Sequence, residues 1–373
     1  MNRIFRRLDK TTLLLYLYLK KFIGRKKIAV TDGAVLILAD LLFGDVAMAG
    51  YLLVSLHQRY PNRKIVVLSK PSLASVVKTF DFVDVVSGDY LSWRVLFMLK
   101  RASPIGYGEV INIFSWKWIP ILNVLDYGTL SSHLSKKSKD NQKIDNIVLM
   151  PVLPMAAPDI VMRLLGETLD LRLKSSWKPS FVNAKSNIGK AYLVIHIGAS
   201  ASSRLWPLWL LEKFIRLCEK HRLFVVFTGL SQDESYMIKF EKMAKKHLKS
   251  NFFSLIGKTS LLDLLETISK ADALISVDTG VIHWARFLSV PNLSVMGQSD
   301  STLFGSDSLL FDNAYCVSTK KLDCQDKHTF HGVKLNWMSG CARGECPLDE
   351  RLCFSEVSQY DIEQNFDRLI SRD

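Results

Sequence analysis

The sequence predicts an α/β protein built from two Rossmann-like domains with a cleft between them. At 373 residues the chain is too long for one hydrophobic core and suits two domains of roughly 150 residues each. Short apolar runs alternate with amphipathic helical stretches along both halves, a rhythm typical of parallel sheets covered by helices. A linker-like stretch rich in polar residues, 174–190, separates the two halves.

The composition is that of a folded protein with a marked basic bias. Hydrophobic residues make up 48% of the chain and charged residues 23%, which excludes a disordered protein. The net charge of +13 predicts an anionic partner, which could be nucleic acid, an acidic membrane surface or a phosphorylated substrate. Because the sequence has no helix-turn-helix, aromatic RNA-binding or zinc-finger pattern, we expect no nucleic-acid partner.

Residues 1–30 form a basic amphipathic segment. Nine cations lie in residues 1–27 against the single acid Asp9, and they flank the apolar run 13–19. That run is shorter than the ~20 residues of a membrane-spanning helix, and no cleavage site follows it, so we expect neither a span nor export. The segment is either an interfacial helix on anionic headgroups or a basic helix packed on the protein. The first alternative, which we favour, predicts a cytoplasmic protein held peripherally at the inner face of the cytoplasmic membrane.

The first domain is expected over residues 31–180. Its opening unit is a strand at 34–38, a turn at Phe43-Gly44-Asp45 and a helix at 46–58, which Pro61-Asn62 ends. Further apolar runs predict strands at 64–68, 83–86, 110–113 and 147–150.

The second domain is expected over residues 190–350 and repeats this rhythm. Strands are predicted at 192–196, 223–227, 252–256, 273–277 and 292–296. Helices are predicted at 233–247, 261–270 and 281–288. A last amphipathic segment, 355–373, predicts a closing C-terminal helix.

The most specific pattern is a strand that ends in Asp278-Thr279-Gly280 and runs into a helix. Free backbone N–H groups and the positive end of a helix are suited to a diphosphate. Thr279 and His283 are four residues apart and share a helix face. The alternative is that Asp278 or Thr279 is a plain N-cap.

A second pattern lies between His196 and Pro207. A strand is followed by a loop of small residues and then by Arg204 and Trp206, just before a helix start. This predicts a phosphate cradle with Arg204 as the counter-charge. The alternative is a surface arginine beside a packed tryptophan, and His196 itself is expected to be a packed histidine.

Together these segments resemble glycosyltransferase family 9, the lipopolysaccharide heptosyltransferases. In that family's order, the matching segments are Gly198–Pro207, Thr228-Gly229, Gly257–Leu261 and Asp278–His283. The likeness extends to the Gly44-Asp45 turn and to the cysteines of the tail, and it covers residues 34–370.

The resemblance implies a GT-B architecture and an inverting glycosyltransferase that needs neither a metal nor another cofactor. It implies that Asp45 is the general base, that ADP-heptose is the donor, and that the acceptor is a glycolipid or glycan of the lipopolysaccharide core or a related surface structure. The implied donor-binding residues are Ser200, Ser203, Arg204, Thr228, Gly229, Glu234, Lys258, Thr259, Asp278, Thr279, Gly280 and His283. One departure is Asp40 and its neighbours, where family members commonly have a basic residue.

Four cysteines lie close together near the C-terminus: Cys324, Cys341, Cys346 and Cys353. We expect them to be thiols or ligands of zinc or iron, with His328 and His331 as spare ligands, and not disulfides. Members of the family that modify autotransporter proteins have a four-cysteine iron site, so a protein O-heptosyltransferase is an alternative function. A non-catalytic nucleotide-sugar-binding or scaffold protein is another alternative, which the joint presence of Asp45, Arg204, Asp278 and His283 opposes.

Overall fold

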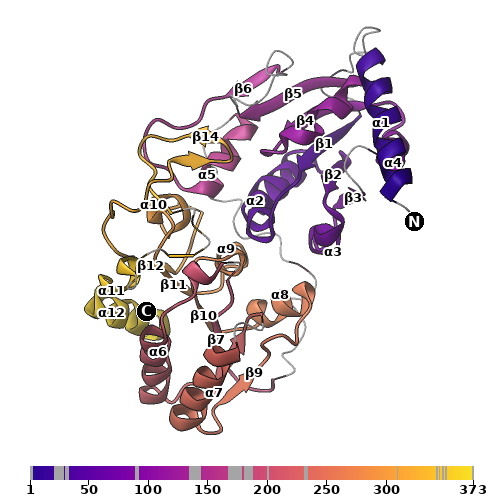
Figure 1. Cartoon of the computed structure of the whole chain (residues 1–373). Helices are drawn as coiled ribbons and strands as arrows, with labels where there is room; N and C mark the ends of the chain where they lie inside the picture. The colour runs from indigo at the N-terminus through magenta and orange to yellow at the C-terminus, as the bar shows by residue number, and fades with distance from the viewer. Residues whose placement is uncertain are drawn as a thin grey trace. The chain divides into compact units, whose positions relative to one another are not determined.

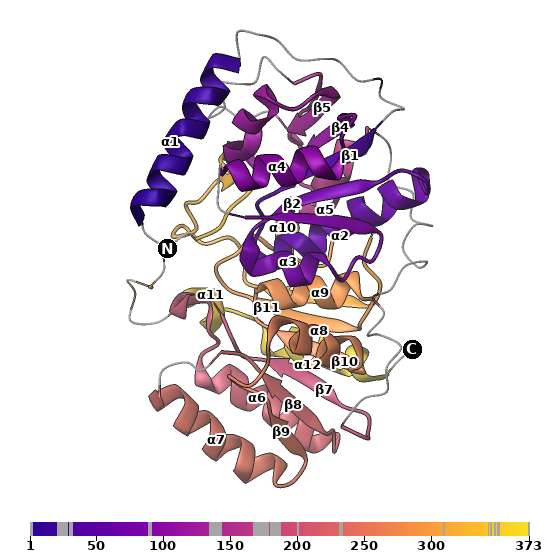
Figure 2. The same cartoon turned by 90° about the vertical axis from the view of Figure 1, so that its right-hand side faces the viewer.

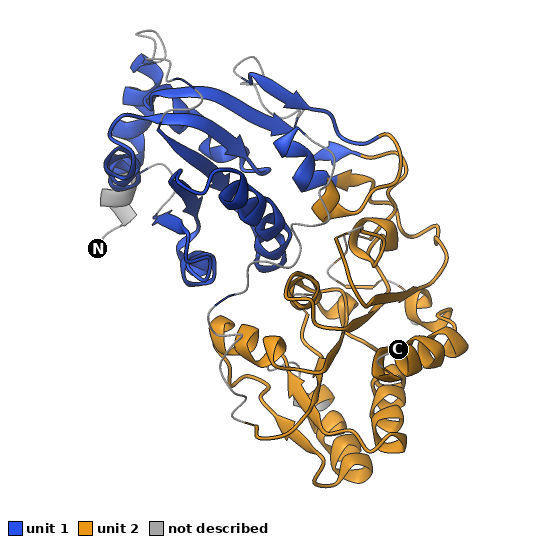
Figure 3. Ribbon diagram, turned by 180° about the vertical axis from the view of Figure 1, so that it is seen from behind, with its two compact units in different colours: residues 1–151, 160–179, 330–334 blue, residues 152–159, 180–329, 335–373 orange. Residues whose placement is uncertain are grey.

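The computed structural model describes residues 3–20, 29, 33–88, 92–133, 144–166, 179, 188–199, 201–230, 234–308, 310–341, 343, 345–346, 348 and 351–371. The chain forms two compact units (Figure 3). Unit 1 comprises residues 1–151, 160–179 and 330–334, and unit 2 comprises residues 152–159, 180–329 and 335–373. Within the described ranges, no helix has both the length and the apolar character needed to cross a bilayer.

Unit 1 is built on a parallel six-stranded sheet in the order β3-β2-β1-β4-β5-β6 (Figure 1). Every residue of the central strand β1 is buried, because helices cover both faces of the sheet, and its sequence is therefore continuously apolar. The strands are β1 (Ala34–Ala39), β2 (Ile65–Ser69), β3 (Val83–Ser87), β4 (Tyr107–Asn112), β5 (Tyr127–His133) and β6 (Asn146–Val148).

The helices of unit 1 cover this sheet, and the N-terminal helix is one of them. Leu13 and Leu17 of α1 are 0% and 2% exposed and lie in the same core cluster as Leu36 and Trp118. The inner face of α1 is therefore part of the fold. The helices are α1 (Arg3–Lys20), α2 (Phe43–Arg59), α3 (Ala74–Val77) and α4 (Trp93–Ala102), with 3₁₀ turns η1 (Pro71–Leu73), η2 (Trp116–Asn123) and η4 (Arg163–Leu165); α5 (Ala157–Met162) has residues in both units.

Unit 2 has a second parallel six-stranded sheet, in the order β12-β11-β10-β7-β8-β9. Counted from its own first strand, this is the same 3-2-1-4-5-6 order as in unit 1, the order of Rossmann domains. The predicted class of two Rossmann-like domains is thus confirmed. The strands are β7 (Leu193–His196), β8 (Val225–Thr228), β9 (Phe252–Ser254), β10 (Ala273–Ser276), β11 (Asn292–Met296) and β12 (Ala314–Ser318).

The C-terminal helix belongs to the core of unit 2, where Ile362, Phe366 and Leu369 are buried. It starts later than predicted, because the Ser358 hydroxyl accepts the N–H of Asp361 and caps a new helix. The helices of unit 2 are α6 (Leu208–Lys220), α7 (Glu234–Leu248), α8 (Leu261–Ser269), α9 (Gly280–Phe287), α10 (Ser301–Phe304), α11 (Leu352–Ser355) and α12 (Gln359–Ser371), with the 3₁₀ turn η7 (Ser202–Arg204). The short strand β13 (Thr329–Phe330) has one residue in each unit, and β14 (Val333–Lys334) belongs to unit 1.

Candidate functional site

The carboxyl edge of the second sheet brings together the two patterns that the sequence singled out. The strand order reverses between β7 and β10, whose last residues, His196 and Ser276, pair directly. The loops that follow these strands, 197–207 and 277–280, therefore start side by side. In open α/β sheets the crevice at such a switch point is where ligands bind.

The backbones of Gly198 and Gly229 lie in close contact below these loops. A Cβ on Gly198 would lie 3.0 Å from the Cα of Gly229, and a Cβ on Gly229 would lie 2.9 Å from the nitrogen of Gly198. Gly229 also has a φ of +151°, which side chains of L-residues rarely adopt. Because the carbonyl of Gly229 accepts the N–H of Gly257 at 2.9 Å, three loops are joined through their backbones.

Below these loops, His196 and Thr228 form a buried pair. The Nδ1 of His196 lies 2.9 Å from the Oγ1 of Thr228, and both side chains are almost fully inaccessible. Burial lowers the pKa of His196 to about 4, although a backbone hydrogen bond at Gly198 opposes this shift. His196 is thus a packed, neutral histidine, and the predicted residue Thr228 acts on it as a hydrogen-bond partner.

The loop after β10 is held at both of its ends. Thr279 is the N-cap of α9, and its hydroxyl accepts the N–H of Val281 at 3.4 Å. Asp278 is buried and accepts a hydrogen bond from the hydroxyl of Ser299, in the loop after β11. The N-cap alternative therefore describes Thr279, whereas Asp278 ties two neighbouring loops together.

Two of the predicted donor-binding side chains hold buried nitrogen atoms that lack a hydrogen-bond partner within the part of the chain that the structure describes. These atoms are the Nε of Arg204 and the Nδ1 of His283. Burial, aided by the positive charge of Arg286, lowers the pKa of His283 to about 3, so its imidazole is neutral at physiological pH. A buried polar atom without a partner costs free energy. A ligand that paired with these nitrogens would recover that cost.

The other predicted donor-binding residues are placed less uniformly. The hydroxyl of Ser203 donates to the carbonyl of Arg343 at 2.9 Å, so it contacts the tail. Lys258 is exposed and donates to the carbonyl of Ser254 at 3.1 Å, and Thr259 is half-buried two residues before α8. Ser200 and the side chain of Glu234 lie outside the described residues.

Asp45 lies at the corresponding edge of the first sheet, in the first turn of α2. The strand order of that sheet reverses between β1 and β4, and α2 follows β1. The Oδ2 of Asp45 accepts the backbone N–H of Leu42 at 3.0 Å. This bond holds the carboxylate at the positive end of the helix, where an anion is favoured. Its role as general base stays a prediction.

A charge cluster at Asp40, five residues before Asp45, was not predicted from the sequence. The carboxylate of Asp40, which follows β1, contacts the ammonium groups of both Lys70 and Lys117, the first at 3.6 Å. Asp40 also donates its backbone N–H to the hydroxyl of Ser115. Asp40 is thus paired with cations from two distant segments, which no local pattern could reveal.

The four tail cysteines line a single cavity of about 110 Å³, together with Ser203, Arg343 and Arg351. Burial, with smaller contributions from Cys346 and Cys324, raises the pKa of Cys353 to about 11. Among the described residues, however, no group of three or more His, Cys, Asp or Glu side chains is arranged to hold a metal ion.

The two proposed spare ligands are engaged elsewhere. His328 contacts the carbonyl of Met338 through its Nδ1 at 2.5 Å. The ring of His331 stacks on that of Phe114, with 4.2 Å between centroids. Neither histidine lines the cysteine cavity, whose lining includes, beside the thiols and arginines, the carboxylate of Glu345 and the amides of Gln298 and Gln325.

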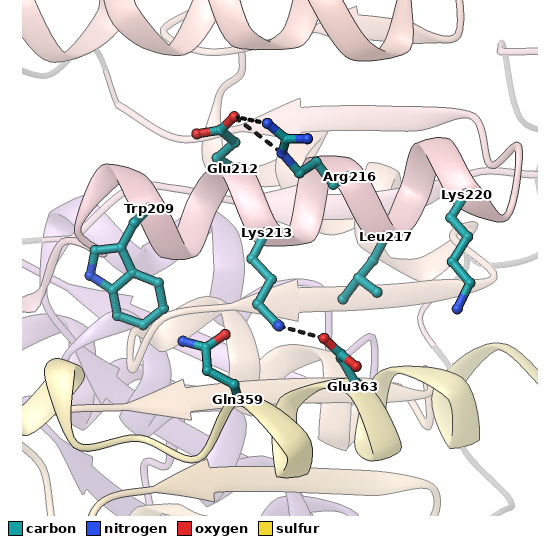
Figure 4. Close-up of a pocket in the computed structure, with 8 residues that line it drawn as sticks. All are labelled: Trp209, Glu212, Lys213, Arg216, Leu217, Lys220, Gln359 and Glu363. Carbon is teal, nitrogen blue, oxygen red and sulfur yellow. Dashed lines mark hydrogen bonds and ion pairs between the residues drawn. The ribbon is translucent and has the colours of Figure 1, made fainter.

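A larger cavity of about 440 Å³ lies between α6 and α12 (Figure 4). Its charged side chains pair with each other, Lys213 with Glu363 at 2.5 Å and Arg216 with Glu212 at 2.8 Å. None of the predicted donor-binding residues that the structure describes lines it. This cavity is therefore separate from the candidate donor loops.

The sequence of this region identifies its family. Residues 164–334 match the model of "Glycosyltransferase family 9 (heptosyltransferase)". The chain carries a glycosyltransferase family 9 domain. This match spans the loops after β7, β8 and β10, so the candidate donor loops lie within the matched residues, whereas Asp45 lies outside them. No curated relative matches the sequence.

Solved structures share the fold over most of the chain. The E. coli ADP-heptose LPS heptosyltransferase II is 13% identical, with a TM-score of 0.65 over 91% of this chain and 99% of that one. E. coli heptosyltransferase WaaC with ADP is 17% identical, with a TM-score of 0.59 over 76% and 92%. The iron-containing dodecameric glycosyltransferase TibC from enterotoxigenic E. coli is 12% identical, with a TM-score of 0.56 over 94% and 80%. At these identities the likeness concerns the fold.

Proposed function

We propose that this glycosyltransferase transfers a heptose from ADP-heptose to a glycan or glycolipid acceptor of the lipopolysaccharide core or a related surface structure, with inversion at the anomeric carbon. The observation that carries the proposal is the pair of buried, unpartnered nitrogens of Arg204 and His283 in the domain that matches family 9. Fold neighbours described with ADP and with ADP-2-deoxy-2-fluoro heptose support the choice of nucleotide and sugar.

In this proposal the donor diphosphate lies on the loops that follow β7 and β10. The guanidinium of Arg204 supplies the positive charge, and the N–H groups at the start of α9 add hydrogen-bond donors. His283, which burial keeps neutral, donates or accepts one hydrogen bond without adding charge. These groups stabilise the charge that develops on the leaving diphosphate, so no metal ion is required.

Asp45 is the proposed general base on the acceptor side. It removes the proton of the acceptor hydroxyl while that oxygen attacks the anomeric carbon from the face opposite the diphosphate. The new bond to the acceptor oxygen forms as the bond to the phosphate oxygen breaks, which inverts the configuration. Its bond to the N–H of Leu42 orients the carboxylate for this step.

A protein acceptor is the second candidate function, and the cysteine cavity favours it. Zinc or iron bound by Cys324, Cys341, Cys346 and Cys353 would hold the tail together, and no step of the proposed reaction passes through it. Because the described side chains are not arranged as a metal site, binding would require them to move closer together.

We place the enzyme on the inner face of the cytoplasmic membrane, where a glycolipid acceptor would be available. The basic residues of the first 27 positions support an anionic membrane surface as its partner.

A thermal-shift panel of nucleotide sugars, followed by transfer assays, tests the proposal. ADP-heptose should raise the melting temperature, because a ligand that binds only the folded state stabilises it by mass action. UDP- and GDP-sugars should raise it less. Transfer should then be measured from ADP-heptose to core oligosaccharide and to a protein acceptor. Stabilisation by another nucleotide sugar alone, or absence of transfer to either acceptor, would contradict it.

A further inference from the structure

The segment 13–19 of α1 is apolar on every side, but only one side is buried. Leu13 and Leu17 lie in the core of unit 1. Leu14, Leu15, Tyr18 and Leu19 point the other way and are 40%, 60%, 61% and 54% exposed. We call these four residues the outer face of α1. A helix that is apolar all round normally has neighbours on all sides, so the outer face is suited to a further apolar contact.

Helix α4 extends this surface. The rings of Tyr16 and Trp93 lie 4.9 Å apart, and the Nε1 of Trp93 donates to the hydroxyl of Thr12 at 3.1 Å. These contacts fix α4 against α1, and Figure 2 shows both helices on the outside of the first sheet. Phe97, one turn after Trp93, is 66% exposed. The outer face of α1 and the two aromatic residues of α4 together form a surface that we call the α1–α4 surface.

Exposed cations of α4 lie next to this surface. Arg94, Lys100 and Arg101 of α4 are exposed, and α4 contains no acidic residue. Apolar and aromatic side chains beside Lys and Arg are typical of helices that lie in the interfacial region of anionic membranes. Because α4 carries three exposed cations and no acid, its charge complements anionic headgroups, and the charge pattern favours a bilayer.

We propose that the α1–α4 surface docks the enzyme on an anionic phospholipid bilayer. Leu15, Leu19 and Phe97 enter the boundary between headgroups and acyl chains, while the α4 cations contact lipid phosphates. The inference rests on the proposed function only in placing the glycolipid acceptor at a membrane, because docking itself requires no transfer. Since Leu13 and Leu17 belong to the core, deletion of α1 would affect folding and docking together, and point substitutions are needed to separate them.

The first test removes the apolar part of the surface. The variant Leu15→Gln/Leu19→Gln/Phe97→Gln should fold with an unchanged melting temperature, because all three side chains are largely exposed. Its affinity for vesicles of phosphatidylglycerol and phosphatidylcholine, measured by co-sedimentation, should fall by at least about tenfold. The matched control Ile238→Gln/Phe253→Gln, two exposed apolar residues of unit 2, should bind like the wild type.

The second test separates this surface from general electrostatic attraction. The variant Arg94→Gln/Lys100→Gln/Arg101→Gln should lose most of the salt-sensitive part of vesicle binding. The control Lys242→Gln/Lys246→Gln/Lys249→Gln removes as many exposed cations from the region of α7 and should retain that part. Equal losses in the two variants would overturn the proposal, because binding would then follow net charge.

Two further results would also overturn it. One is wild-type protein that does not co-sediment with anionic vesicles at low salt. The other is self-association of the wild type, measured by sedimentation velocity, that is lost in the Leu15→Gln/Leu19→Gln/Phe97→Gln variant. The surface would then be a contact between copies of this chain. Transfer to a water-soluble acceptor fragment is measured in parallel, so loss of docking and failure of the proposed reaction can be told apart.

Discussion

Arg351 donates through its Nη1 to the carbonyl oxygen of Leu205 at 2.6 Å. The same nitrogen donates to the carbonyl of Ser202 at 3.2 Å, so one guanidinium holds both ends of the short turn η7 that carries Arg204. The tail thereby positions a loop of the candidate donor site. Ser203, in the middle of that turn, adds a third bond to the tail through the carbonyl of Arg343.

We therefore expect Arg351→Gln to weaken donor binding although Arg351 is not proposed to touch the donor. Loss of hydrogen bonds from a charged group costs about 1.5–3 kcal/mol when none replaces them, and part of this loss should appear as a fall in ADP-heptose affinity of up to roughly tenfold. Isothermal titration calorimetry measures it. Arg368→Gln, on the exposed side of α12, is the control and should bind normally. An unchanged affinity in Arg351→Gln would exclude the positioning role.

Arg204→Ala and His283→Ala should each weaken nucleotide-sugar binding directly. Each removes a proposed partner of the diphosphate, at a cost of about 1–3 kcal/mol, or roughly 5- to 150-fold in dissociation constant. Lys242→Ala, an exposed cation on α7, should leave donor affinity unchanged. Donor affinity that survives both substitutions would move the diphosphate to another part of the domain.

Asp45→Asn should lower turnover by roughly 10²-fold or more, the usual scale for the loss of a general base. Donor affinity should change little, because the asparagine oxygen can still accept the N–H of Leu42 and keep the start of α2 intact. Rates are compared in a radiolabelled transfer assay. The control Asp84→Asn removes an exposed carboxylate that pairs with Lys64, and it should transfer at the normal rate. Normal turnover of Asp45→Asn would require another base.

Stability should fall as the pH is lowered below 6.5. Burial lowers the pKa of His133 and His196 to about 4 and that of His283 to about 3, whereas in the unfolded chain they titrate near 6.5. At pH values between the folded and unfolded pKa, each of these histidines is protonated in the unfolded state but neutral in the folded state. As the pH falls through this range, each histidine lowers the free energy of unfolding by up to about 1.4 kcal/mol per pH unit. Above pH 6.5 it has no such effect.

Urea unfolding at a series of pH values measures this dependence. His283→Gln should be less stable than the wild type at neutral pH, because the packing of a buried ring is lost, but its stability should decline less steeply as the pH falls. A slope equal to that of the wild type would mean that His283 titrates normally.

Chelation should leave the transfer rate unchanged, since the proposed site uses Arg204 and helix N–H groups in place of a metal ion. EDTA treatment followed by metal analysis and a transfer assay checks this. A fall in melting temperature at constant rate would identify a structural metal at the tail cysteines. Loss of the rate, restored by adding one particular metal, would contradict the metal-independent mechanism.

The sequence allowed both sheets and the donor loops to be predicted, because buried strands and loops with glycine or helix starts have local signatures. Two strands of these sheets, β5 and β12, were not predicted. β5 is interrupted by Gly128 and the buried polar pair Ser131 and Ser132, and Ser132 accepts a hydrogen bond from Asn112 of β4 at 3.0 Å. β12 is only partly buried, so its sequence is not continuously apolar. A polar strand is stabilised by its neighbours in the sheet, which are distant in the sequence.

Some parts of the candidate site could likewise be predicted from local sequence patterns, and others could not. The loops after β7 and β10 are local patterns, and their meeting follows from the strand order. Other contacts join residues that are far apart along the chain. These are the ion pairs of Asp40 with Lys70 and Lys117, and the hydrogen bonds from Arg351 to η7. No local pattern encodes such pairs, so only the folded structure reveals them.

The packing of α1 also has a consequence for synthesis on the ribosome. Leu13 and Leu17 share a core with Trp118, Ile121 and Leu122 of η2, and Asn123 donates to the carbonyl of Leu17 at 3.5 Å. A chain grows from its N-terminus at about 5–20 residues per second, so α1 leaves the ribosome on the order of 5–20 s before η2 is made. During that interval the leucines of both faces are exposed on the nascent chain. Helix α1 is thus a segment on which early chaperone or membrane contact would act.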